Sequence, residues 1–282
     1  MDLSLSNPIV QSSILPLCLS LLIAAALGFS STKGARIAAL GVAISALITV
    51  IIIQGFSFPP KATSQKLPYL IAAAGVIGLI FDLLKLKGIA WRLAGIILPV
   101  ATIGWLFGSR LGSTQIDGFI YLSAAVLVSL FAYWQFEKSR HQLDSGIQIL
   151  LYCAGLGAIL MIGSSAMLSQ SAFGLMAAVG GFLLLNWPKF RFPIGAALIF
   201  PLTTALAAMT AQSLFFTKAS GVAIAVLIPV LLISYLLPKI PLLKKVSSPA
   251  IRAICLTAVG MAPLGASIVV AIMLTETSGL SY

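Results

Sequence analysis

Few residues in this sequence carry groups that could bind or react with a ligand. Inside the apolar segments the candidates are prolines, which interrupt the hydrogen bonds of a helix, and the threonines near them. Pro99, Pro201, Pro229 and Pro263 each fall near the centre of an apolar block. A proline lacks the backbone N–H and clashes with the preceding turn, so it leaves a helix carbonyl without its donor. In lipid such a carbonyl is costly unless it lines a cavity or meets another helix. Transporters bind solutes where interrupted helices meet near the middle of the membrane.

Hydroxyl groups lie close to two of these prolines: Thr102 follows Pro99, and Thr203 and Thr204 follow Pro201. The pattern predicts a substrate site, and the alternative is that the prolines only kink helices to improve packing. The predicted substrate-binding residues are Pro99, Thr102, Pro201, Thr203, Thr204, Pro263 and Asp82.

Asp82 is the acid that stands inside or at the edge of a mid-chain apolar block. A carboxylate within a membrane is expensive, and by default it suggests function. However, Asp82 lies near the end of its block, and Lys85 at i+3 shares its helix face. An ion pair at the membrane interface is therefore the simpler interpretation. No second acid stands nearby to build a proton or sodium relay.

Other polar groups suggest structure rather than catalysis. His141 and Asp144 at i+3 could form an acid–base pair, but the mixed charges of 137–144 are typical of a solvated loop. Cys18, Cys153 and Cys255 lie in different apolar blocks, which disfavours a disulfide framework or zinc site. The loop 54–69, with two adjacent prolines and several aromatics, either caps an external vestibule, binds a partner or rests at the interface.

The elements that position these residues are membrane helices. Of 282 residues, 60% are hydrophobic and 8% are charged, with a mean hydropathy of +1.12; a soluble surface needs more charge. We predict an all-α polytopic bundle, residues 1–282 forming a single transmembrane domain, whose first block is a membrane helix and no cleaved signal. The ten predicted blocks are 9–29, 37–53, 69–84, 93–107, 119–136, 147–168, 172–186, 194–212, 221–237 and 251–273.

The positive charges alternate between loops and predict an orientation. The loops after the first, third, fifth, seventh and ninth blocks hold thirteen of the 17 Lys and Arg residues. The other four are Lys61, Lys66, Arg110 and Lys218. By the positive-inside rule the odd loops face the cytoplasm, so both termini lie on the other side of a cell (inner) membrane. The scattered basic residues fit anionic lipid headgroups and argue against a nucleic-acid partner.

Two further patterns concern packing and membrane depth. Small residues recur at helix-packing spacing in 41–49 and 174–181, which predicts close helix contacts. Trp91, Trp134 and Trp187 fall at predicted cytoplasmic ends and Trp105 near an external one, as an interfacial aromatic belt would.

Three functions are compatible with these features. The first is a permease-like transporter or exporter of a small, weakly polar solute, without a cofactor, since nucleotide-binding motifs are missing. The second is a non-catalytic subunit that holds other membrane subunits. The third is an intramembrane enzyme on lipid-linked substrates. Gly78-Leu-Ile-Phe-Asp82-Leu-Leu-Lys85 resembles a segment of the polyprenyl-phosphate sugar-phosphate transferases, which also have ten helices and external termini. Phe81 replaces the first of their paired aspartates, and their other acids and histidines are missing, so we do not assign that family.

Overall fold

The chain forms a bundle of apolar helices, as predicted. The computed structural model describes residues 7–30, 34–108, 116–139, 143–236 and 249–279, and this part of the chain contains helices and turns but no strand. Eight helices in it are long and apolar enough to cross a membrane, and two shorter apolar stretches lie at Val126–Phe136 and Gly221–Tyr235. Each of the ten predicted blocks thus coincides with helical structure.

The helices follow one another with short connections. Their bounds are Leu15–Ser30 (α1, after a π-helical turn, Val10–Ile14), Gly34–Ile37 (α2), Leu40–Gln54 (α3), Leu67–Leu84 (α4), Ile89–Phe107 (α5), Ile116–Ser139 (α6), Asp144–Ile162 (α7), Ala166–Leu185 (α8), Ala196–Phe216 (α9), Gly221–Leu227 (α10), Ile233–Leu236 (α11) and Pro249–Gly279 (α12). A 3₁₀ segment at Ile228–Leu232 joins α10 to α11.

One predicted boundary was wrong. The block 147–168 runs through a turn, because α7 ends at Ile162 and α8 begins at Ala166. The residues between them are small and uncharged, so hydropathy does not separate the two helices. Gly163 packs against the backbone of Ala219, where a Cβ would lie 2.7 Å from the nitrogen. This close approach requires the glycine.

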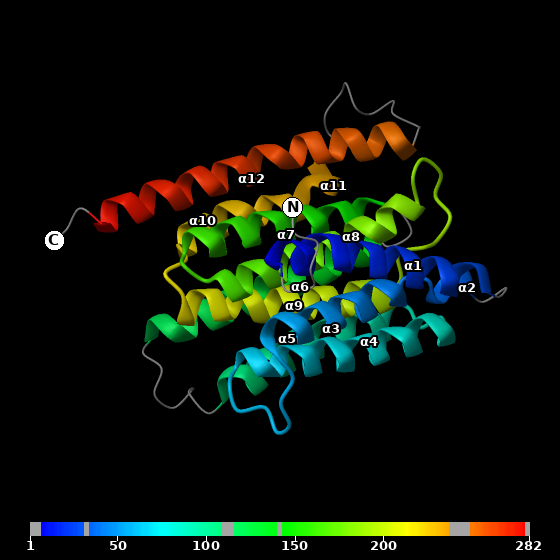
Figure 1. Cartoon of the computed structure of the whole chain (residues 1–282), viewed down its shortest axis with the longest axis horizontal. Helices are drawn as coiled ribbons and strands as arrows, with labels where there is room; N and C mark the ends of the chain where they lie inside the picture. The colour runs from blue at the N-terminus through cyan, green and yellow to red at the C-terminus, as the bar shows by residue number, and fades with distance from the viewer. Residues whose placement is uncertain (1–6, 31–33, 109–115, 140–142, 237–248, 280–282) are drawn as a thin grey trace.

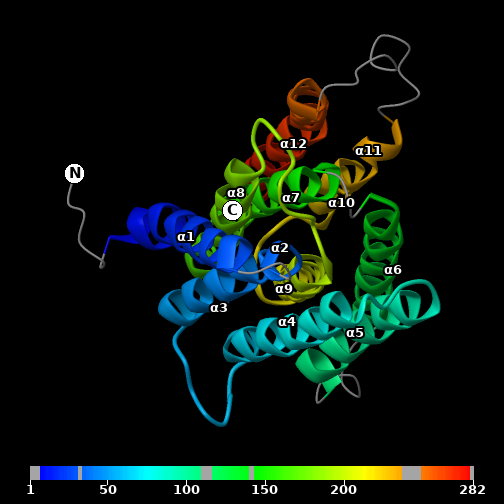
Figure 2. The same ribbon diagram turned by 90° about the vertical axis from the view of Figure 1, so that its right-hand side faces the viewer.

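Helix α9 is the centre of the bundle. Figure 2 shows it end-on, and it contacts α3, α4, α5, α6, α7 and α8. All residues from Ala196 to Ser213 are buried. A helix that is apolar on every side has no face for water and is expected inside a protein. This central position decides which side chains can form an internal site.

Small residues join α1 to α3 and α8, which confirms the packing prediction. Gly41 lies against the backbone of Ala24, where a Cβ would come within 2.6 Å of its nitrogen. The Ser45 hydroxyl donates to the Pro16 carbonyl at 2.7 Å, and Gly181 lies against the Leu17 carbonyl. These contacts bring helix backbones together without relying on a hydrophobic effect, which is weak between helices in lipid.

The connections separate into two ends of the bundle, which is elongated along its helices (Figure 1). At one end Asp82 of α4 binds the start of α9, and Asp144 of α7 binds Arg252 of α12. At the other, the Gln212 side chain reaches the Thr63 carbonyl, and the Lys218 N–H donates to the Gly163 carbonyl. The described segments that flank odd loops and those that flank even loops therefore lie at opposite ends, which agrees with the charge pattern. Which end faces the cytoplasm stays a prediction.

The prediction that all four tryptophans lie in an interfacial belt was wrong for Trp91. Trp105, Trp134 and Trp187 are exposed, each by more than 40%. Trp91 instead is 2% exposed, and its ring packs against Phe81 and Phe200. It lies on the face of α5 that meets α9, so it belongs to the core rather than to the interface.

Candidate functional site

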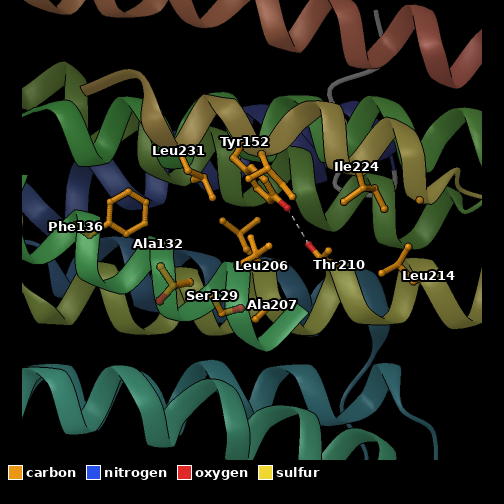
Figure 3. Close-up of a pocket in the computed structure, with 15 residues that line it drawn as sticks. Ser129, Ala132, Phe136, Tyr152, Leu206, Ala207, Thr210, Leu214, Ile224 and Leu231 are labelled. Atoms are coloured by element: carbon orange, nitrogen blue, oxygen red, sulfur yellow. Dashed lines mark hydrogen bonds between the residues drawn. The ribbon is translucent and has the colours of Figure 1, made fainter. Parts of the chain in front are cut away.

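A cavity of about 260 Å³ lies between α6, α7, α9 and α10 with the 3₁₀ segment that follows it (Figure 3). Its wall is mainly apolar, and hydroxyls reach it from four residues. The lining residues are Val128, Ser129, Ala132, Phe136, Tyr152, Thr203, Leu206, Ala207, Thr210, Leu214, Gly221, Ile224, Ala225, Ile228 and Leu231.

The spacing of small residues on α9 explains why space is left there. Thr203, Ala207 and Thr210 stand four and then three positions apart, so they share one helix face. Across the cavity the chain presents Gly221 and Ala225, which are smaller still than threonine. Short side chains on facing helices leave a gap that neighbouring leucines and isoleucines do not fill.

The hydroxyls of the cavity differ in what they can offer a ligand. Tyr152 Oη and Thr210 Oγ1 are 3.4 Å apart, and either can donate to the other. The hydroxyl that accepts keeps its own proton for a ligand. Thr203 Oγ1 donates to the carbonyls of Ile199 at 2.5 Å and Phe200 at 3.2 Å, so it faces the cavity as an acceptor. The Tyr152–Thr210 pair can therefore offer a donor, and Thr203 on the same face of α9 as Thr210 can offer an acceptor.

The cavity meets a break in a helix. The 3₁₀ segment Ile228–Leu232 interrupts the helical run from Gly221 to Leu236 and contains Pro229. The Gln148 side-chain amide donates to the Leu231 carbonyl at 2.8 Å and to Ser234 Oγ at 3.0 Å. A short 3₁₀ stretch within a helix often marks a hinge. Interrupted backbone therefore lies at the wall of the cavity, although none of the predicted site prolines is a lining residue.

Of the predicted site residues, the structure places Thr203 on this cavity. Thr204 faces another side of α9, where its hydroxyl lies 3.4 Å from Tyr133 Oη. Pro201 is buried in the same helix. On α5, Pro99 is buried, and Thr102 Oγ1 donates to the Leu98 carbonyl at 2.6 Å. These residues do not line the cavity.

Pro263 also stands apart from the cavity. It is half-buried within α12, which continues through it from Pro249 to Gly279.

Three residues of the cavity, Ser129, Tyr152 and Thr210, were not predicted from the sequence, since single hydroxyls in apolar helices carry no local signal. Thr203, Ala207 and Thr210 are four and then three positions apart, a small-residue pattern that could have indicated Thr210.

Asp82 binds the backbone at the start of α9, a role that was not predicted beside the expected ion pair with Lys85. Its Oδ1 accepts the N–H of Ala196 and its Oδ2 the N–H of Ala197, both at 2.8 Å. These are the first two N–H groups of α9, which have no partner within the helix. The carboxylate thus caps the central helix and also favours the positive end of its dipole.

Asp144 is likewise buried and paired, so the prediction of a solvated loop was wrong for this residue. Arg252 Nε lies 3.0 and 3.2 Å from its two carboxylate oxygens, and Nη2 lies 2.5 Å from Oδ2. The Asp144 side chain is 4% exposed. His141, its expected partner, lies outside the described residues. The fork of the guanidinium fixes the start of α12 to the start of α7.

The loop 54–69 is bound to the end of the bundle. The Tyr69 hydroxyl donates to the Ser57 carbonyl at 2.7 Å, and Lys66 Nζ donates to the Trp105 carbonyl at 2.8 Å. Gln65 Oε1 accepts the N–H groups of Lys61 and Ala62. Such internal bonds favour a fixed cap over the ends of α4 and α5.

No protein-family model and no curated protein sequence matches the chain.

Proposed function

We propose that this chain is a permease-like transporter of a small, neutral and weakly polar solute, which binds in the cavity beside α9. The observation that carries the proposal is the position of this cavity. It lies against the middle of the central helix, and its wall includes the 3₁₀ break at Ile228–Leu232. Substrate sites of secondary transporters have this arrangement, with interrupted helices at the middle of the membrane.

The lining sets the chemistry of the solute. The cavity has no Lys, Arg, Asp or Glu among its lining residues. A charged solute would lose its hydration there without an opposite charge, at a cost of several kcal/mol. A neutral molecule with an apolar end and a hydroxyl or amide group matches the apolar wall and the hydroxyls of Tyr152, Thr203 and Thr210. At about 260 Å³ the space falls just below the roughly 300–1,000 Å³ of drug-sized pockets, which indicates a small solute.

The loop charges support a place in a cell membrane with the odd loops in the cytoplasm. A solute bound beside α9 would then be exchanged between cytoplasm and exterior. Small-residue contacts and the lack of a described soluble domain are compatible with this simple architecture.

Efflux from vesicles tests the proposal. Purified protein is placed in liposomes loaded with a panel of small alcohols, polyols and amides, and release is followed by mass spectrometry against protein-free liposomes. We expect at least one solute to leave faster with the wild-type protein. Ala207→Phe, which fills the cavity, should abolish this excess rate, and Thr210→Val should reduce it by about tenfold through the loss of one hydrogen bond.

The control is Val269→Phe, which adds the same aromatic ring at an exposed position on α12. This variant should release the solute at the wild-type rate. The proposal is wrong if no solute exceeds its rate from protein-free liposomes, or if Thr210→Val and Ala207→Phe both behave as the control does.

A further inference from the structure

A second pocket lies at the start of α9, apart from the cavity described above. It has a volume of about 280 Å³ and is bordered by the end of α4, the turn that follows it and the segment before α9. The charged residues that line it are Arg36, Asp82, Lys85 and Lys87, and Pro193 and Gly195 supply backbone. No lining residue is shared with the cavity beside α9.

The charges around this pocket are unbalanced. Arg36, Lys85 and Lys87 contribute three positive charges, and Asp82 contributes the negative one. Both carboxylate oxygens of Asp82 already accept backbone N–H groups of α9. Within the described part of the chain, neither a hydrogen bond nor an ion pair occupies any of the three cations. Like charges that share a pocket repel one another, and an anion between them removes that cost.

The backbone places the cations around the same space. Lys85 ends α4 with a left-handed φ of 56°, and Gly88 begins the approach to α5 with a φ of 64°. The turn between these two residues carries Lys85 and Lys87 to the pocket, while Arg36 reaches it from α2. Gly195 also lines the pocket, and it lies so close to Asp82 that a Cβ there would collide with the carboxylate. The turn after α4 thus brings two of the three cations to the pocket.

We propose that this pocket binds a phosphate group. A guanidinium offers a planar fork of donors that suits phosphate oxygens, and lysine ammonium groups bind phosphate as point charges. The pocket lies at the end of α4 and the start of α9, next to two odd loops of the sequence, so it stands at the predicted level of cytoplasmic headgroups. The phosphate belongs either to an anionic lipid or to a free phosphorylated compound, which share this chemistry.

Binding to the purified full-length protein tests the proposal. In native mass spectrometry we compare dioleoyl-phosphatidylglycerol with dioleoyl-phosphatidylcholine, and we titrate inorganic phosphate while following the unfolding temperature. Lys85→Gln with Lys87→Gln should weaken binding of the phosphate probe about thirtyfold, the effect expected for two surface lysines. Lys189→Gln with Arg191→Gln is the matched control, since it removes two exposed positive charges from another odd loop.

The outcomes separate the sources of the phosphate. Retention of phosphatidylglycerol that inorganic phosphate does not displace supports a lipid headgroup. Saturable stabilisation by inorganic phosphate, lost in the Lys85 and Lys87 variant, supports a free phosphorylated compound. The proposal is overturned if phosphatidylglycerol binds no better than phosphatidylcholine and phosphate has no effect, or if both double variants lose binding equally. The unfolding temperatures of the variants without ligand show that each is folded.

Discussion

The carboxylate of Asp82 joins two helices that are far apart in the sequence. It binds the N–H groups of Ala196 and Ala197, 114 and 115 residues away. In an apolar interior an unpaired N–H group costs more than it does in water, because no solvent replaces the lost partner. One side chain thus satisfies the start of the most deeply buried helix and fixes α4 against it.

Replacement of this carboxylate should destabilise the fold. Asp82→Ala leaves two N–H groups unpaired, and we expect the free energy of unfolding to fall by about 1–2 kcal/mol. Asp82→Asn should have a smaller effect, since its amide has a single acceptor oxygen. Unfolding in mixed detergent micelles, followed by circular dichroism, measures both.

Lys85→Gln is the control for this experiment. It removes the charge at i+3 and leaves the cap intact, so the free energy of unfolding should change by less than about 0.5 kcal/mol. If Lys85→Gln were as harmful as Asp82→Ala, the ion pair rather than the cap would explain why the aspartate is there.

The sequence pointed to some residues of the cavity and of the buried polar contacts, but not to their partners. The prolines drew attention to Thr203, which lines the cavity, and to Pro229, which lies in the 3₁₀ break, because a missing N–H has a consequence that can be read from one position. Asp82 and Asp144 were seen, but their partners were not, since Ala196 and Arg252 are distant and carry no matching local pattern. Tyr152 and Thr210 become part of a site only after α7 and α9 are packed together.

At the scale of helices, α4 and α9 approach more closely than ordinary side chains allow. A Cβ on Gly78 would collide with the carbonyl oxygen of Ala196 and lie 2.7 Å from its carbon. The obstacle is backbone, which cannot rotate away as a side chain does. Asp82 lies one turn further along α4, so this crossing and the cap of α9 depend on each other.

Gly78→Ala should therefore separate the two helices. We expect it to lower the free energy of unfolding by about 1–3 kcal/mol, the usual cost of overpacking. Gly104→Ala is a matched control on α5, where an added Cβ meets nothing within 4 Å. It should leave stability unchanged or raise it by up to about 1 kcal/mol through better helix propensity. Equal effects in the two variants would show that α4 and α9 do not meet at Gly78.

Hydropathy predicted the helices well and their ends less well. Each block is helical because apolar residues in lipid must satisfy their backbone internally. The turn after Ile162 was missed because its glycine and serines are no more polar than many residues within helices. Which helix lies in the centre was not predicted either. The uniform burial of α9 reflects how the other helices surround it, and its hydropathy is the lowest of the eight candidate spans in the described part of the chain.

At the scale of the whole molecule, the distribution of Lys and Arg residues among the loops and the contacts between described segments both distinguish two ends of the bundle. The odd loops carry thirteen of the 17 positive residues, and the structure joins the segments around Asp82, Ala196, Asp144 and Arg252 at one end. The opposite end brings Thr63 to Gln212 and Gly163 to Lys218. Membrane insertion retains positive loops in the cytoplasm, so this asymmetry predicts how the bundle is oriented.

Labelling of single cysteines tests that orientation. In a variant whose Cys18, Cys153 and Cys255 are replaced by alanine, one cysteine is introduced in place of an exposed lysine at either end. A membrane-impermeant maleimide on intact cells should modify Lys61→Cys and Lys218→Cys, which lie at the even-loop end. Lys87→Cys and Lys189→Cys should react only after the membrane is permeabilised, because the odd loops are then on the cytoplasmic side.

The reverse labelling pattern would mean that the bundle has the opposite orientation in the membrane. The proposed phosphate pocket would then face the exterior, while the cavity beside α9 would lie at the same depth. Labelling of all four positions on intact cells would be incompatible with alternating loops. Those four lysines are exposed in the structure, so a failure to react on intact cells reports the membrane and not burial within the protein. The orientation matters for both proposals, since it decides which pool of phosphate the pocket meets and from which side a solute enters.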